Sequence, residues 1–168
     1  EWSGLVQKVY YREHSFFGDW KTGHNPTNHD DVNAIASEFG MQTPLGYDDA
    51  AVGGTFVKMG IGELKKTKNE KYGFHKKYDV VNPFDWEIQQ DDLMISFHQV
   101  MNDFKGWGYD YTKTIELHPN KPIMTVIHEL KNVGEKPLDT DYYCHNFTMI
   151  DDDIIDERYV LAFPFDVE

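Results

Sequence analysis

A histidine and a glutamate of this sequence are candidates for acid–base chemistry. His145 stands in the run Tyr-Tyr-Cys-His-Asn-Phe over 142–147, and Glu38 begins the run Glu-Phe-Gly over 38–40. An imidazole titrates near neutrality and can therefore donate or accept a proton. The carboxylate could accept hydrogen bonds from hydroxyl groups, or act as a base where burial raises a carboxyl pKa. The structural alternatives are a histidine satisfied by a backbone carbonyl and a glutamate that caps a local turn.

Other polar residues give weaker signals. His24, His29, Asp30 and Asp31 have the composition of a metal site, but their spacing matches no tight ligand motif, which favours solvent exposure, and we expect no metal. His98 and His128 fall on predicted strands and are expected to be half-buried and satisfied. The acidic run over 151–157 reads as a solvated turn. The sequence has no phosphate-binding glycine loop and no nucleophile elbow, and we expect no cofactor.

The elements that must position these residues are predicted to be strands. Leu93, Ile95 and Phe97 alternate with Met94, Ser96 and His98, and a period of two is typical of half-buried strands. Many short strands separated by turn residues indicate one all-β domain over 1–168, an antiparallel sandwich or barrel. The predicted strands cover 4–11, 14–19, 54–62, 73–81, 85–90, 92–101, 108–118, 122–132, 138–149 and 158–163.

The segment from about 20 to 54 departs from this pattern. It is rich in glycine, proline and charged residues, and long polar loops inside a domain tend to be functional or disordered. Apolar anchors such as Trp20, Phe39 and Tyr47 favour an ordered binding-site lid, with one short helical turn over 30–38.

The composition and charge of the chain narrow the classes of binding partner. The formal net charge is −13, which disfavours nucleic acid and anionic membranes. The cluster Lys65, Lys66, Lys68 and Lys71 reads as a solvated hairpin loop. A single cysteine excludes an internal disulfide, and aromatic residues make up 15% of the chain. Aromatic side chains either fill a β core or stack on the apolar faces of sugars.

An ordered set of short motifs resembles the galactose mutarotase-like (aldose 1-epimerase) superfamily, in particular its uncharacterised bacterial branch. The motifs span nearly the whole chain and lie at 2–4, 37–40, 43–48, 56–62, 78–83, 130–138 and 145–147. The resemblance implies an antiparallel β-sandwich of the mutarotase type, whose concave face holds a mono- or oligosaccharide.

The resemblance also assigns roles. By resemblance, His145 would be the acid that protonates the ring oxygen. Glu38 is our candidate for the second catalytic group from its residue type and its place in the 20–54 segment, and the resemblance does not assign it. His75, Asn146, Tyr143 and Trp107 would contact the sugar, although the lysines after His75 equally indicate an exposed strand. The implied activity is interconversion of sugar anomers. The alternatives are a non-catalytic carbohydrate-binding module and an accessory domain of a polysaccharide-degrading enzyme.

The resemblance is partial in one respect. The match begins after the first strands of the family and stops at Phe163-Pro164-Phe165, whereas the catalytic glutamate of the family lies in a later part that has no counterpart here. We therefore expect a fragment, a fold completed by a second chain or segment, or a different function.

Overall fold

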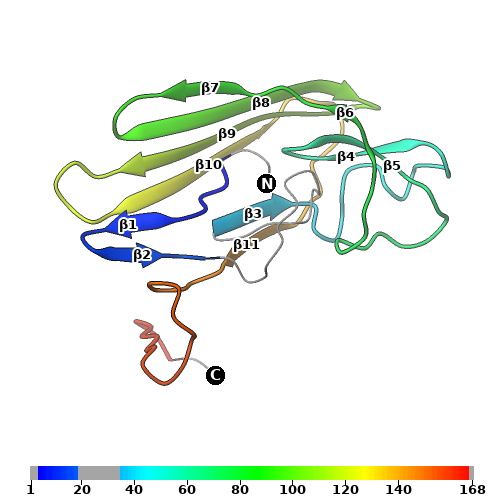
Figure 1. Cartoon of the computed structure of the whole chain (residues 1–168). Coiled ribbons are helices and arrows are strands. Elements are labelled where there is room, and N and C mark those ends of the chain that lie inside the picture. Colours follow the sequence, from blue (N-terminus) through cyan, green and yellow to red (C-terminus); the bar gives the residue numbers. More distant parts are fainter. Residues whose placement is uncertain (1–3, 19–34, 167–168) are drawn as a thin grey trace.

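The structure is a computed structural model that describes residues 4–18 and 35–166. Within these ranges every regular element is a strand and all paired strands are antiparallel (Figure 1), which confirms the all-β class. The strands are β1 (Val9–Tyr11), β2 (His14–Phe16), β3 (Ile35–Phe39), β4 (Thr55–Lys58), β5 (Gly62–Lys65), β6 (Val80–Pro83), β7 (Glu87–Gln90), β8 (Met94–Phe104), β9 (Trp107–Leu117), β10 (Met124–Asn132) and β11 (Tyr142–Asn146). No helix in the described ranges is long and apolar enough to cross a membrane.

The largest sheet has the order β10-β9-β8-β7, with long central strands β8 and β9. Its register places Phe97 opposite Lys113, and Met101 opposite Tyr109, so these four buried side chains share one face. The predicted alternation is confirmed at Phe97, which is buried in β8, whereas Leu93 is 42% exposed and lies outside the strand.

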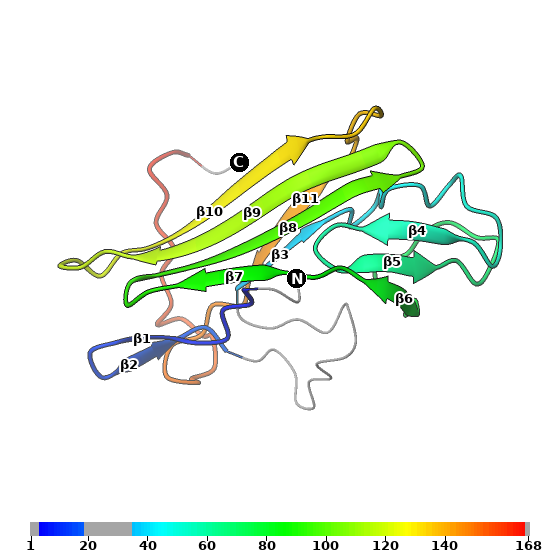
Figure 2. The ribbon, with the colours of Figure 1, turned by 90° about the horizontal axis from the view of Figure 1, so that it is seen from above.

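The two-stranded sheet β3-β11 lies beneath the four-stranded sheet (Figures 1 and 2). The Phe39 ring packs edge-on against Tyr111 at 5.3 Å between centroids, and Tyr142 packs against His128 at 5.3 Å. One face of β3-β11 is therefore turned toward β9 and β10. The opposite face is called here the outer face of β3-β11.

The three-stranded sheet β4-β5-β6 contributes side chains to two hydrophobic cores. Val57 joins a core with Leu45, Met101 and Tyr109, whereas its neighbour Phe56 joins a second core with Tyr47, Ile61, Leu64 and Tyr78. Adjacent residues on a strand point to opposite faces, so a strand buried on both faces reads as a continuous apolar run.

Several predicted elements need correction. The predicted helical turn over 30–38 is wrong at 35–38, where the chain forms β3; residues 30–34 lie outside the described ranges. The expected strand 54–62 is the hairpin β4–β5, because Gly60 and Gly62 adopt positive φ and turn the chain. Only residues 80 and 81 of the expected strand 73–81 lie in a strand, as the start of β6, and 158–163 forms none. Lys66 is buried and donates to the Tyr47 carbonyl, so it does not belong to a solvated loop.

Candidate functional site

Glu38 and His145 lie on the same outer face of β3-β11. The register pairs Glu38 with Tyr143 and Ala36 with His145. Cα partners in an antiparallel pair point to the same side, so Glu38, Tyr143 and His145 share this face. The two residues predicted to be catalytic thus stand on neighbouring strands, about two residues apart along the sheet.

Glu38 is engaged by a buried lysine. Its carboxylate forms an ion pair with the Lys58 ammonium, whose side chain is 0% exposed, and the Glu38 side chain is 12% exposed. The same ammonium donates to the Tyr72 hydroxyl at 2.9 Å. A buried charge needs a partner of opposite sign, so Lys58 both requires Glu38 and orients it.

His145 is half-buried in an aromatic setting. Its ring stacks on Phe147 at 3.8 Å between centroids and lies 5.8 Å from the Tyr143 ring. Its Nδ1 atom is buried and has no hydrogen-bond partner in the described ranges. A buried ring nitrogen without a partner is a group that a ligand or water can satisfy. No backbone carbonyl of the described ranges accepts a hydrogen bond from this nitrogen.

Asn146 belongs to the other face of β11. It alternates with His145 along the strand, pairs with Ile35, and its side-chain oxygen lies 3.5 Å from the Cys144 sulfur. The structure therefore does not bring Asn146 together with His145, Glu38 and Tyr143.

His75 and Trp107, two predicted sugar contacts far apart in sequence, line one hollow of about 680 Å³. We call it the Trp107 hollow. Its lining comes from the segments 41–49 and 71–75, from the start of β9, and from Asp139. Its lining combines aromatic, hydroxyl, amide and carboxylate groups, including Tyr47, Tyr72, Phe74, Thr43, Gln42, Asp48 and Asp49.

The walls of the Trp107 hollow are fixed by specific bonds. The Asp141 carboxylate accepts from the backbone of Gln42 and from both the backbone and hydroxyl of Thr43 at 2.8–3.2 Å. Burial acts to raise the pKa of Asp141, but these donors outweigh it and hold the pKa below its usual value. On the other side, the Tyr47 hydroxyl donates to the Glu70 carbonyl at 3.1 Å. The hollow is thus largely pre-formed.

Trp107 is held from several sides. Lys136 places its ammonium 3.8 Å from the indole centroid, and Phe104 stacks at 6.4 Å. Gly46 has φ +76°, and a Cβ there would lie 3.1 Å from the indole, so glycine allows this close approach. Phe74 is more open, with 44% of its surface exposed. Sequence reasoning missed Phe74, although an aromatic residue beside His75 in a turn-rich segment was an available signal.

Tyr72 connects the Trp107 hollow with the ion pair between Lys58 and Glu38. Its ring lines the Trp107 hollow and its hydroxyl accepts from Lys58, which binds Glu38. Two polar contacts thus lead from the wall of the hollow to the predicted catalytic carboxylate. The lining of the hollow includes neither Glu38 nor His145.

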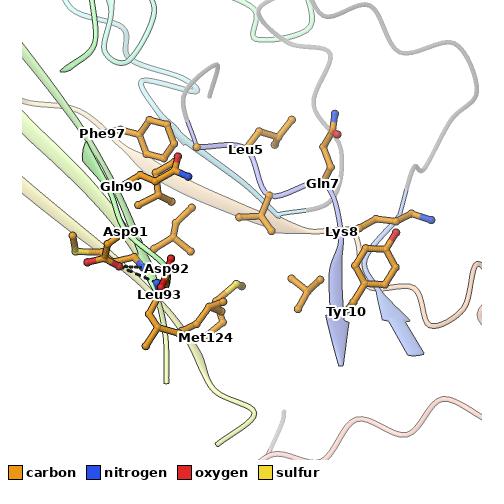
Figure 3. Close-up of a pocket in the computed structure, with 17 residues that line it drawn as sticks. Leu5, Gln7, Lys8, Tyr10, Gln90, Asp91, Asp92, Leu93, Phe97 and Met124 are labelled. Carbon is orange, nitrogen blue, oxygen red and sulfur yellow. Dashed lines mark hydrogen bonds between the residues drawn. The ribbon is translucent and has the colours of Figure 1, made fainter. Parts of the chain in front are cut away.

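A second hollow, of about 800 Å³, lies between residues 4–10 and the ends of β8, β9 and β10. Figure 3 shows its mainly apolar lining, with Asp91 and Asp92 at one end and Lys8 and Tyr10 at the other. It contains none of the predicted site residues.

A partly buried polar cluster lies between the four-stranded sheet and β3-β11, where the sequence analysis expected a satisfied, half-buried His128. His128 is bonded through its two ring nitrogens to the hydroxyls of Tyr111 and Tyr142, at 2.8 and 3.1 Å, which confirms that it is satisfied. Burial, reinforced by the Lys113 charge, lowers the pKa of His128 to about 4. Burial likewise lowers the pKa of Lys113 to about 8, and its ammonium donates to the Gly4 carbonyl at 2.7 Å.

Within the described ranges, no group of three or more histidine, cysteine or carboxylate side chains could hold a metal. The metal-type residues His24, His29, Asp30 and Asp31 lie outside those ranges. No family model, curated protein or solved structure matches the chain.

Proposed function

We propose that this chain binds a mono- or oligosaccharide in the Trp107 hollow. The observation that carries the proposal is the meeting of Trp107, Phe74 and His75 with carboxylate, amide and hydroxyl groups in one pre-formed concavity. Sugar recognition combines an aromatic surface for the apolar ring face with polar groups for the hydroxyls, and small-molecule sites are concave and largely pre-formed. A β-sandwich of the galactose mutarotase type is the fold we propose for this domain.

The binding test uses a panel of mono- and oligosaccharides, followed by calorimetry and by chemical-shift changes in the protein. We expect saturable binding that Phe74→Ala and Trp107→Ala each weaken about tenfold, in line with the loss of an aromatic contact. Tyr10→Ala is the control, because Tyr10 is 71% exposed and remote from this hollow. Equal affinity in all three variants would contradict the proposal.

A second candidate function is interconversion of sugar anomers on the outer face of β3-β11. It is favoured by the shared face of Glu38 and His145 and by the Nδ1 of His145, which has no partner among the residues that the structure describes. The imidazolium would protonate the ring oxygen while the Glu38 carboxylate takes the anomeric hydroxyl proton, and the C1–O5 bond breaks to give the open aldehyde. Rotation about C1–C2 and the reverse proton transfers then close the other anomer.

Polarimetry on freshly dissolved sugar tests this reaction. We expect His145→Ala and Glu38→Gln each to lower the catalysed rate at least a hundredfold, the usual contribution of a general acid or base. His98→Ala is the matched histidine control, because His98 stands on β8 and pairs with Asp110. An unchanged rate in His145→Ala removes this residue from the mechanism.

A further inference from the structure

The strand β10 forms a long open edge of the four-stranded sheet. Among the described residues β10 pairs with β9 alone, and residues 124–132 form no backbone hydrogen bond outside that pairing. Its side chains alternate between half-buried, on the face where His128 contacts Tyr142, and exposed on the other face. An open edge offers a row of backbone donors and acceptors to another strand.

The segment 158–163 has the composition of a strand but pairs with none. Its sequence is Arg-Tyr-Val-Leu-Ala-Phe, and branched and aromatic residues favour strands. Val160, Leu161 and Phe163 are each more than half exposed, and residues 160–163 form no backbone hydrogen bond within the described ranges. A continuous exposed apolar stretch of this kind marks an interaction surface.

One antiparallel register makes segment 158–163 and the edge of β10 complementary. Cα partners in an antiparallel pair point to the same side, so every second residue of the segment would join the half-buried face of β10. The apolar and aromatic residues of the segment then lie on that face, and its one charge meets a charge of opposite sign. The pairs would be Arg158–Glu129, Tyr159–His128, Val160–Ile127, Leu161–Val126, Ala162–Thr125 and Phe163–Met124.

Neighbouring registers fit less well. A shift of one residue turns Tyr159, Leu161 and Phe163 to the exposed face of β10 and Arg158 to the half-buried one. A shift of two residues in one direction sets Arg158 opposite Lys131, where like charges repel, and in the other direction removes the charged partner. Arg158 now pairs with exposed aspartates, and pairs of that kind exchange at little cost.

Segment 158–163 lies away from the β10 edge of its own chain. Figure 1 shows the chain after β11 on the side of β3-β11 opposite to the four-stranded sheet. Contacts just before the segment tether it there. The Asp151 carboxylate accepts from the Ser15 backbone at 2.9 Å, and Asp152 pairs with Lys8 at 2.8 Å. A second copy of the chain offers the same complementary segment without this tether.

We propose that two copies of this chain associate by strand addition, with segment 158–163 of one copy paired antiparallel to β10 of the other. Backbone hydrogen bonds supply affinity in this mode, and alternate side chains set the register. Reciprocal exchange of the two segments closes a twofold dimer. The inference concerns a different surface from the Trp107 hollow and does not depend on sugar binding.

Sedimentation velocity over a wide range of protein concentration tests the association. We expect a dimer that dissociates on dilution, and Leu161→Asp should raise its dissociation constant about tenfold, because a charge enters the half-buried face. The matched control is Ile154→Asp, which adds the same charge at a residue 81% exposed outside the segment and should leave the constant unchanged. Both variants should keep the unfolding free energy of the dilute monomer. A monomer at every concentration, or a dimer that Leu161→Asp leaves intact, overturns the proposal.

Disulfide trapping tests the register and the partner, in a Cys144→Ser background because Cys144 is exposed. A chain with Thr125→Cys mixed with a tagged chain with Ala162→Cys should give a covalent dimer, since opposite residues come within disulfide reach. The control replaces Ala162→Cys by Leu161→Cys, whose side chain would point to the other face, and should link about tenfold less. Equal linking in both mixtures overturns the register. Linking only within one chain that carries both Thr125→Cys and Ala162→Cys overturns the second copy as partner.

Discussion

At the scale of single residues, the fold places charged groups in interior positions where each depends on a neighbour. Lys58, Lys66 and Lys113 are all buried, and each ammonium donates to a carbonyl or pairs with a carboxylate. Such groups are costly to bury and specify which elements can pack together.

Breaking the Lys58–Glu38 pair should be strongly destabilising. Lys58→Met leaves the Glu38 carboxylate without its partner, and we expect a loss of about 3–5 kcal/mol in the free energy of unfolding. The double variant Lys58→Met/Glu38→Gln should lose distinctly less, because no lone charge remains. Urea denaturation measures both, and equal losses in the two variants would contradict this account.

His128 and His98 should give opposite pH dependences of stability. The folded pKa of His128 lies at about 4, below its unfolded value, so the unfolded chain takes up a proton first as pH falls from about 6.5 to 4 and stability declines in that window. His128→Gln should remove this decline.

The pKa of His98 is raised, chiefly by its hydrogen bond to Asp110. Its contribution to stability is present below about pH 6.5 and is lost as pH rises through the folded pKa. His98→Gln should therefore be least stable, relative to the parent chain, at acidic pH. Denaturation curves at several pH values compare the two variants, and the same sign in both would contradict the assignment.

At the scale of elements, close backbone approach fixes the hairpin β4–β5 and its contact with β6. Gly62 has φ +148°, and a Cβ there would lie 2.8 Å from the Pro83 Cα and still closer to the Asn82 carbonyl. Backbone atoms cannot yield as a flexible side chain can, so this position requires glycine.

Gly62→Ala should cost about 2–4 kcal/mol in the free energy of unfolding, from the strained φ and the backbone clash together. Gly53→Ala is the control, because Gly53 has φ +89° but nothing lies within 4 Å of an added Cβ. Gly53→Ala should cost about 1 kcal/mol in the free energy of unfolding, because it carries the backbone strain of a positive φ without a clash. Thermal unfolding separates the two, and equal costs would show that the approach to β6 is not decisive.

At the scale of the whole molecule, stability resides in the sheets and not in the last residues. Residues 154–166 form no strand and expose large apolar side chains, including Ile154 at 81%, Val160 at 85% and Leu161 at 83%. Their apolar area is not removed from water and so contributes little to stability.

Truncation after Asp153 should therefore change the free energy of unfolding by less than about 1 kcal/mol, because it removes only exposed contacts such as the Arg158–Asp153 pair. Truncation after Asp141 removes β11 and should be far more destabilising, since β3 loses its pairing partner. Denaturation of the two shortened chains measures this difference. A large loss of unfolding free energy in the chain truncated after Asp153 would show that the C-terminal residues belong to the stabilising core.

The sequence by itself determined the class of structure and most of the long strands. Period-two alternation is local, so β8, β9 and β10 could be read from it, and the chemistry of His145 and Glu38 follows from residue type. The short strand β3 could not, because five residues in a polar segment form a strand only through pairing with β11, more than one hundred residues later. Tertiary structure alone decided that Glu38 meets Lys58, that Asn146 faces away from His145, and that His75 and Trp107 line one hollow. These contacts join residues that are far apart in the sequence. They depend on how much surface the elements bury against one another, which no local sequence pattern predicts.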